Sequence, residues 1–202
     1  MEQFFKNSAI LADIFLTIAL VIAIIKYQLF TKNEKWYIYY AIFVFCIEII
    51  LFFKIKESSK IFYPIYIAGE FFLMTGLFIK KLNINRYYFI LTTFISILFF
   101  SIGKIFPQYE NDYSKAISNL IIICLVACSL IQEIKKYSSR NHFLFLDGVI
   151  FLYYTVSIFI FMFQHQLILF HLDSFYIFWV INNILLCILY FTFLYTFLQL
   201  KK

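Results

Sequence analysis

Seven apolar stretches, each about as long as a lipid bilayer is thick, limit what this chain can fold into. A helix that crosses the hydrocarbon layer of about 30 Å needs about 20 mostly apolar residues, because it rises about 1.5 Å per residue. The stretches lie at residues 8–27, 36–54, 61–79, 87–106, 114–133, 142–164 and 174–199. The sequence therefore predicts an all-α fold, a polytopic membrane protein built as a bundle of seven transmembrane helices.

The composition supports this prediction and limits the domain organisation. Hydrophobic residues make up 64% of the chain and charged residues 14%, whereas soluble domains are about 45–50% apolar and about 25% charged. The breaks between the stretches are too short to fold alone, which excludes an attached soluble catalytic, DNA-binding or kinase domain. We expect residues 1–202 to form a single integral membrane domain in contact with the lipid bilayer. The first stretch contains Asp13 and is followed by Lys26, so we expect a retained helix rather than a cleaved signal peptide.

The basic residues predict an orientation. Short cytoplasmic loops are enriched in Lys and Arg, and the 17 basic residues divide into 11 on one side of the seven spans and 6 on the other. This predicts an outside amino terminus and a cytoplasmic carboxyl terminus. Direct nucleic-acid binding is not expected, since the basic residues occur in twos and threes at helix ends rather than on one face. The residues predicted to contact headgroups or a cytoplasmic partner are Lys32, Lys35, Lys80, Lys81, Arg86, Lys135, Lys136 and Arg140.

Polar residues inside the spans are the candidate functional site. A charge at the bilayer centre costs about 2.5–3.5 kcal/mol on the insertion scale, so such residues should face the bundle interior. Counting about 1.5 Å per residue from the outer helix ends places one set at a shared depth of roughly 7–14 Å. We therefore predict an acidic, amide-lined chamber in the outer half, while Asp147 lies near the inner end of its helix. The predicted chamber residues are Asp13, Glu48, Glu70, Asn119, Asn182 and Asn183.

Two interpretations of Glu70 remain open at this point. With no basic residue near it in the sequence, the carboxylate either takes up a proton or holds a cation or a cationic ligand. Alternatively, a protonated Glu hydrogen-bonded to Asn ties two helices together for about 0.6–2 kcal/mol. Nearby, Gly69 and Gly76 lie on one helix face and predict a close-packed contact, with a hinge as the alternative.

Sequence motifs for catalysis and metal binding are absent. The chain has neither G-x-S-x-G nor H-E-x-x-H, and its four glycines rule out a Walker loop. The four cysteines all lie within spans, which argues against an extracellular disulfide framework. Cys124 and Cys128 share a helix face but are too few for a zinc site, and His165, His171 and Asp173 are expected to be solvated loop residues. We therefore expect a non-enzymatic protein without a metal or cofactor. A retinal protein is also excluded, because the last stretch has no lysine before its end.

A resemblance adds a functional expectation. The stretches "FLDGVIFLYYTVSIFIFMF" and "FWVINNILLCILYFTF" resemble the last two helices of uncharacterised bacterial seven-helix proteins. In size and hydropathy the whole chain is similar to the small multi-pass accessory proteins encoded beside type VI-B CRISPR RNA-targeting effectors. The resemblance implies a location in the bacterial inner membrane and a role in antiviral defence, in which the protein regulates a cytoplasmic RNA-guided nuclease.

Three functions are therefore predicted, and the sequence leaves them open. The first is a membrane accessory protein that regulates a CRISPR effector. The second is a small-solute or proton- or cation-coupled transporter, or a ligand sensor, that uses the outer chamber. The third is an oligomeric pore-forming effector, since thin-looped helices can assemble laterally.

Overall fold

The computed structural model describes residues 2–53, 59–105, 111–135, 142–170 and 172–200. These residues form seven α-helices and one short 3₁₀ turn, η1 (Tyr27–Leu29). The helices are α1 (Glu2–Ile25), α2 (Lys35–Phe53), α3 (Ser59–Lys81), α4 (Arg86–Ile105), α5 (Asn111–Lys135), α6 (Leu144–Phe170) and α7 (Leu172–Gln199).

Each helix contains most of one predicted span, so the all-α fold and the number of helices are confirmed. The largest difference lies between the last two helices, where a polar loop was predicted over residues 164–174. Instead, α6 continues to Phe170 and α7 begins at Leu172. The reason is the apolar run Leu167–Phe170, which continues the helix and leaves little length for a loop. His165 is therefore in a helix rather than in the predicted loop, while His171 lies outside the described residues.

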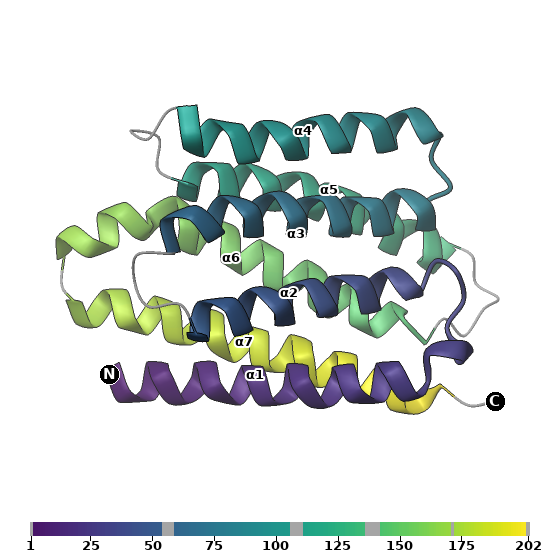
Figure 1. Ribbon diagram of the computed structural model, residues 1–202, viewed down its shortest axis with the longest axis horizontal. Helices are drawn as coiled ribbons and strands as arrows, with labels where there is room; N and C mark the ends of the chain where they lie inside the picture. The colour runs from purple at the N-terminus through teal and green to yellow at the C-terminus, as the bar shows by residue number, and fades with distance from the viewer. Residues whose placement is uncertain (1, 54–58, 106–110, 136–141, 171, 201–202) are drawn as a thin grey trace.

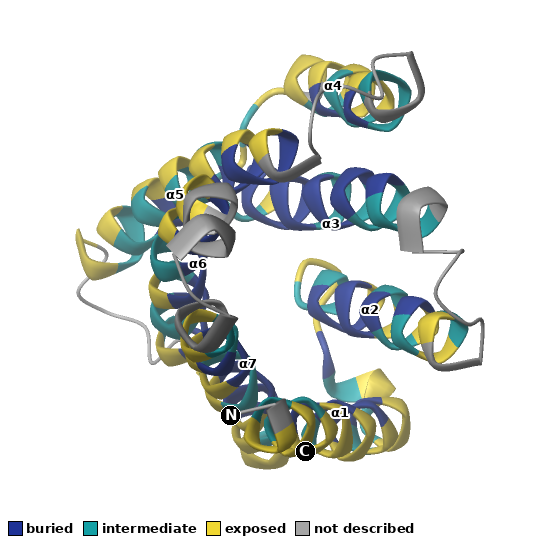
Figure 2. Cartoon of the chain, turned by 90° about the vertical axis from the view of Figure 1, so that its left-hand side faces the viewer, coloured by how far each residue is buried: buried dark blue, intermediate teal, exposed yellow. Residues whose placement is uncertain are grey.

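Six of the helices form a ring, seen end-on in Figure 2. Going round it, the neighbours that pack together are α3, α5, α6, α7, α1 and α2, and α2 packs back against α3. The remaining helix, α4, lies outside the ring against α3 (Figure 1). Side chains from opposite sides of the ring can therefore meet in its interior.

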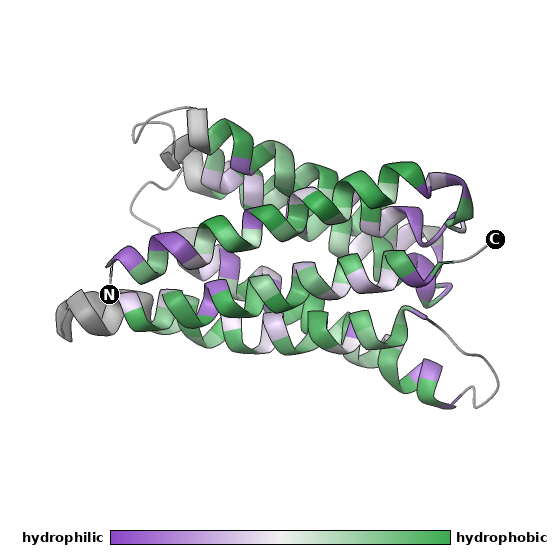
Figure 3. Cartoon of the chain, turned by 90° about the horizontal axis from the view of Figure 1, so that it is seen from below, coloured by the Kyte–Doolittle hydropathy of each residue, from purple (hydrophilic) through white to green (hydrophobic). Residues whose placement is uncertain are grey.

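The distribution of polarity is that of a protein in lipid. Large apolar side chains such as Ile25 (76% exposed) and Ile90 (68% exposed) cover the outside, while polar side chains such as Glu70 and Asp147 are buried. Hydrophilic colour gathers toward the two ends of the bundle in Figure 3. An apolar surface of this extent would aggregate in water. Among the described residues, five helices are long and apolar enough to cross a membrane, namely α1, α3, α5, α6 and α7. The chain is thus a multi-pass membrane protein by length and composition.

Short polar motifs define the helix ends on one side of the bundle. The Thr31 N–H donates to Glu34 Oε2 (2.7 Å) and the Glu34 N–H to Thr31 Oγ1 (3.4 Å), a capping box ahead of α2. Asn83 closes α3 with a left-handed backbone (φ 54°), and the Ile84 N–H donates back to the Ile79 carbonyl. Lys26 Nζ donates to the Leu198 and Leu200 carbonyls (2.7 and 2.8 Å), joining the end of α1 to the end of α7.

The close-packed face predicted for Gly69 and Gly76 is confirmed. A Cβ on Gly69 would lie 2.2 Å from the Phe43 ring, and one on Gly76 would lie 2.6 Å from the Trp36 ring. Both rings belong to α2. The absence of a side chain at these positions lets aromatic rings of α2 rest on the backbone of α3, which fixes the spacing of the two helices.

Candidate functional site

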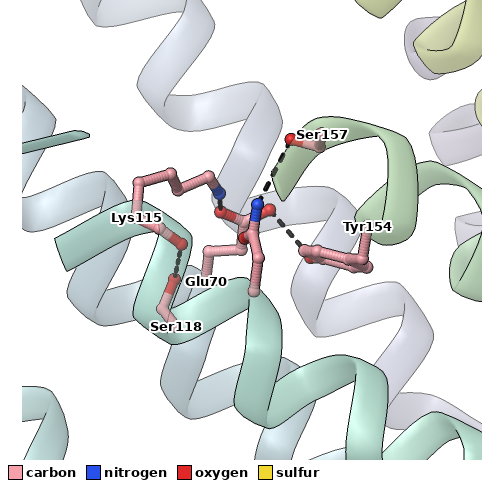
Figure 4. Close-up of polar contacts among 6 residues, drawn as sticks. Glu70, Lys115, Ser118, Tyr154 and Ser157 are labelled. Atoms are coloured by element: carbon pink, nitrogen blue, oxygen red, sulfur yellow. Dashed lines mark hydrogen bonds and ion pairs between the residues drawn. The ribbon is translucent and has the colours of Figure 1, made fainter. Parts of the chain in front are cut away.

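A buried ion pair lies inside the ring. Lys115 on α5 donates from Nζ to Glu70 Oε2 on α3, and each of the two side chains is only 1% exposed. The Tyr154 hydroxyl on α6 donates to the other carboxylate oxygen at 2.8 Å. Figure 4 shows the three side chains converging from their separate helices. We call Glu70, Lys115 and Tyr154 the Glu70 bridge.

Aromatic rings surround the Lys115 ammonium. The nitrogen lies 4.7 Å from the Tyr66 ring centroid and 5.9 Å from those of Tyr154 and Phe161. These distances fall within the roughly 6 Å over which the negative face of a ring attracts a cation. The charge is therefore held both by a carboxylate and by three rings, away from water.

Amide and hydroxyl groups extend the polar interior from this bridge. Asn119, one turn after Lys115 on α5, donates from Nδ2 to Ser157 Oγ at 3.2 Å. Ser157 and Asn182 both share hydrogen bonds with Tyr153. The side-chain oxygens of Asn119 and Asn182 are buried, and no hydrogen-bond partner reaches either of them among the described residues. The interior thus carries two unused acceptors close to a charged pair.

The expectation that Glu70 lacks a basic partner was wrong. Because Lys115 is the second residue of the predicted span 114–133, the charge count places it at the outer surface. The helix begins earlier, at Asn111, and Lys115 lies on its buried face. A buried Glu and Lys that pair with each other need neither a bound cation nor a protonated carboxyl to be tolerated in a low-dielectric interior. This removes the main argument for a simple cation site at Glu70.

Direct contacts join only some of the six predicted chamber residues. Glu70 and Asn119 lie beside the Glu70 bridge, and Asn182 joins them through Tyr153. The other three belong to α1 and the two helices that pack against it, α2 and α7. Asp13 on α1 is exposed and Glu48 on α2 is half-buried, and the two carboxyl groups lie close enough to interact electrostatically with each other and with buried Tyr190 on α7.

Asn183 is held between α1 and α7. Its Nδ2 donates to the Phe5 carbonyl at 3.3 Å and to Ser8 Oγ at 3.2 Å. This is the helix-tying role that an intramembrane amide can have, worth about 1 kcal/mol or less. Asn183 is therefore part of the α1–α7 contact and not of the Glu70 bridge.

A second buried ion pair lies nearer the end of the bundle where α1 finishes. Asp147, in the first turn of α6, accepts from Lys81 Nζ at Oδ2 and from the Tyr37 hydroxyl at Oδ1. The Asp147 side chain is fully buried, and that of Lys81 is 13% exposed. Both charges also suit their helix ends, since Asp147 lies in the first turn of α6 and Lys81 is the last residue of α3. We call Asp147, Lys81 and Tyr37 the Asp147 bridge.

A pocket with a cavity volume of about 200 Å³ opens beside the Asp147 bridge. At about 30 Å³ for each water, it has room for roughly six. Acidic, basic and aromatic side chains line it together. Its lining residues are Thr31, Asn33, Glu34, Tyr37, Leu77, Lys81, Glu133 and Phe143.

The basic residues predicted to contact a partner or headgroups fall into different environments. Lys81 was wrongly assigned to this surface, because it is paired with buried Asp147. Lys35 and Lys80 lie over the Tyr27 and Trp36 rings, at 4.3 and 4.5 Å. Of the rest, Lys32 and Lys135 are exposed, Arg86 begins α4 with a side chain outside the described set, and Lys136 and Arg140 lie outside the described residues.

Sequence reasoning missed three members of the two bridges: Lys115, Tyr154 and Tyr37. The signal for Lys115 is periodicity. It shares a stripe of α5 with Ser118, Asn119, Ile122 and Val126, all buried, and the spacings of three and four residues mark one helix face. Comparisons with known proteins add nothing to this geometry, since no family model, curated protein or solved structure matches the chain.

Proposed function

We propose that the protein is a membrane carrier for a small polar solute, in which two polar bridges close the interior of the helix ring at different depths. In this proposal all seven helices cross the inner membrane of a bacterium, with the amino terminus outside and the carboxyl terminus in the cytoplasm. The observation that carries the proposal is that the same two helices, α3 and α6, which lie on either side of α5 in the ring, are joined twice by polar side chains. Ionisable side chains inside a membrane are costly, and they commonly mark solute or proton pathways.

The spacing of the bridges along the helices supports the proposal. On α3, Glu70 and Lys81 are eleven residues apart, and on α6, Asp147 and Tyr154 are seven apart. Both spacings return a side chain to nearly the same helix face. The four residues thus form two crossings between facing sides of α3 and α6, about 10–17 Å apart along the axis at about 1.5 Å per residue.

The backbones of α3 and α6 are not among the helix pairs that pack extensively. Long side chains, rather than close helix contact, therefore join them. Such a contact can open by exchanging polar partners, whereas a close-packed contact resists separation. If one bridge opens while the other stays closed, the interior becomes accessible from one side at a time, as carriers require.

Cysteine accessibility tests the carrier function without knowledge of the solute. The reporter is Met74→Cys, since Met74 is 0% exposed and lies on α3 between the two bridges. It is introduced after Cys46, Cys124, Cys128 and Cys187 have been replaced by Ala. A membrane-impermeant thiol reagent is then added to either side of oriented vesicles.

Opening one bridge should expose the reporter from one side only. Glu70→Gln with Lys115→Met should allow labelling from the side where α1 begins, and Lys81→Met with Asp147→Asn from the opposite side. With both bridges intact, Met74→Cys should be labelled slowly from either side. Protection from both sides in every variant would refute the carrier, and fast labelling from both sides with intact bridges would indicate an open pore instead.

The regulatory role implied by the resemblance to CRISPR accessory proteins stays a prediction. Exposed Lys32 and Lys135 lie at the end of the bundle that the charge bias assigns to the cytoplasm, where an effector would dock. Identifying the neighbouring genes tests it. A gene without a nuclease or a CRISPR array beside it would count against that role.

A further inference from the structure

The Lys115 ammonium is bound as a separate ligand would be. One carboxylate neutralises it, and the Tyr66, Tyr154 and Phe161 rings face it at 4.7, 5.9 and 5.9 Å. Aromatic rings combined with an acid are the usual recognition chemistry for ammonium ligands. We call Glu70, Tyr66, Tyr154 and Phe161 the ammonium cage. Its walls come from α3 and α6 and its occupant from α5, so the occupant can leave without taking a wall with it.

An unused acceptor lies next to the cage. Asn119 is 0% exposed and follows Lys115 by one turn, and its Oδ1 has no hydrogen-bond partner within the described ranges. A buried carbonyl oxygen without a donor is uncommon and unfavourable. An ammonium group has three N–H donors, and Lys115 gives one to Glu70. An ammonium that is free to position itself can donate to Glu70 and to Asn119 Oδ1 together. The unpaired Asn119 oxygen would then help to bind the solute.

The geometry points to a binding site for a small primary ammonium solute, in which Lys115 is a tethered competitor that the solute displaces from the cage. This inference rests on the proposed function for its biological meaning, because it names the solute class that a carrier of this kind would take. Displacement moves the Lys115 charge away from Glu70 while the solute replaces it. The carboxylate therefore keeps a cation beside it, and the Glu70 bridge can rearrange without leaving a bare charge in the interior.

The test measures binding of n-propylammonium to the full chain in nanodiscs. Lys115→Ala removes the side-chain atoms that this ion replaces. Trp179 reports occupancy by fluorescence, since its ring lies 5.8 Å from that of Phe161, and Trp36→Phe leaves it as the only tryptophan. The neutral isostere 1-propanol is the ligand control, and Glu70→Gln with Lys115→Ala is the cage control.

Saturable binding to both the parent and Lys115→Ala is expected. It should be tighter by about tenfold or more in Lys115→Ala, because the cage is then free of its competitor, and it should be lost in the double variant and with 1-propanol. No saturable binding in Lys115→Ala, equal affinity in the double variant, or binding to Lys115→Ala without binding to the parent would each overturn the inference. The affinities of the variants could follow the expected order while Met74→Cys remains protected from the thiol reagent on both sides. That result would support the ammonium cage and refute only the carrier function.

Discussion

At the residue scale, Lys115 and Glu70 each make the burial of the other tolerable. Removing one partner of a buried pair leaves an uncompensated charge, which typically costs about 3–5 kcal/mol. We expect Lys115→Met and Glu70→Gln each to lower the free energy of unfolding by about that amount. Thermal or denaturant unfolding of the purified protein in nanodiscs measures the loss.

The double variant provides the control for this prediction. Glu70→Gln with Lys115→Met carries no charge at either position, so it should be more stable than either single variant. Replacing a buried pair by neutral groups of similar size is often close to neutral. A double variant that loses the sum of the two single losses would mean that the side chains are not coupled.

Tyr154 has a smaller and separate effect at the same site. Its hydroxyl donates to Glu70 Oε1 at 2.8 Å in a fully buried position, and hydrogen bonds to charged groups contribute about 1.5–3 kcal/mol. Tyr154→Phe should therefore lower the free energy of unfolding by about that amount. The matched control is Tyr195→Phe, since Tyr195 is 48% exposed. Equal effects from the two substitutions, measured by thermal unfolding, would argue against the hydrogen bond.

Hydropathy alone could find the depth of Glu70 but not its partner. Hydropathy analysis places charged residues in loops, so it predicts both Lys115 and Lys81 at the membrane surface. Their pairing depends on which way each helix is rotated and on contacts between residues 45 and 66 positions apart. The buried stripe that includes Lys115 and Asn119 was present in the sequence. It indicates that Lys115 faces inward, although it cannot say which acid it meets.

At the element scale, the contact of α2 with α3 depends on a missing side chain at Gly76. Trp36 lies against this glycine and is itself held by Phe72 and Phe89 at ring distances of 6.2 and 5.5 Å. A methyl group there must push a ring that cannot move freely, and overpacking usually costs about 1–3 kcal/mol. Gly76→Ala should therefore lower the unfolding temperature.

Gly148 is the matched control for that substitution. It lies in α6, and an added Cβ would meet nothing within 4 Å. Gly148→Ala should be neutral or stabilising by about 0.5–1 kcal/mol, as expected for a glycine in a helix. If both substitutions shift the unfolding temperature equally, the close approach of Trp36 would not be the cause.

Lys26 caps the carboxyl end of α7. Its ammonium donates to the carbonyls of Leu198, in the last turn of α7, and of Leu200, one residue past its end, and cations near a helix carboxyl terminus contribute about 0.3–1 kcal/mol. Lys26→Met should therefore speed amide hydrogen exchange in the last turn of α7 with little effect on global stability. Lys32→Met, at an exposed position nearby, is the control. Unchanged exchange in the last turn of α7 would show that the cap has no effect there.

The number of helices followed from hydropathy because each of the seven apolar stretches is long enough to form a helix of its own. Helix ends were harder to predict, since apolar residues can extend a helix beyond the length that a bilayer crossing requires. The run Leu167–Phe170 extended α6 in this way. The arrangement of the ring was not predictable, because the lipid-facing and interior faces of α2 and α7 are both apolar and leave little pattern to show rotation.

At the scale of the whole molecule, the ring explains how ionisable side chains can be buried in an apolar bundle. Its interior receives side chains from six helices, so an acid on one can meet a base on another. The outer helix, α4, takes no part in either bridge, and its outward face carries Tyr87, Ile90 and Phe94. In the proposed carrier, α4 supports α3 from the lipid side, while the bridges on the inner face of α3 control access.

The orientation of the molecule is predicted from the unequal number of basic residues on its two sides. This inequality remains when the lysines of the two bridges are left out. In the predicted orientation the two paired lysines, Lys81 and Lys115, belong to opposite sides, so removing them leaves ten basic residues on one side and five on the other. The helices alternate in direction, and α1 begins at the end of the bundle opposite to where α7 finishes (Figure 1).

We therefore expect Lys6→Cys, in a variant without native cysteines, to react with an impermeant maleimide on intact cells. Asn85→Cys and Gln199→Cys should react only after lysis. Labelling of both Lys6→Cys and Gln199→Cys on intact cells would contradict an odd number of crossings, and the reverse pattern would retain the seven spans but invert the orientation.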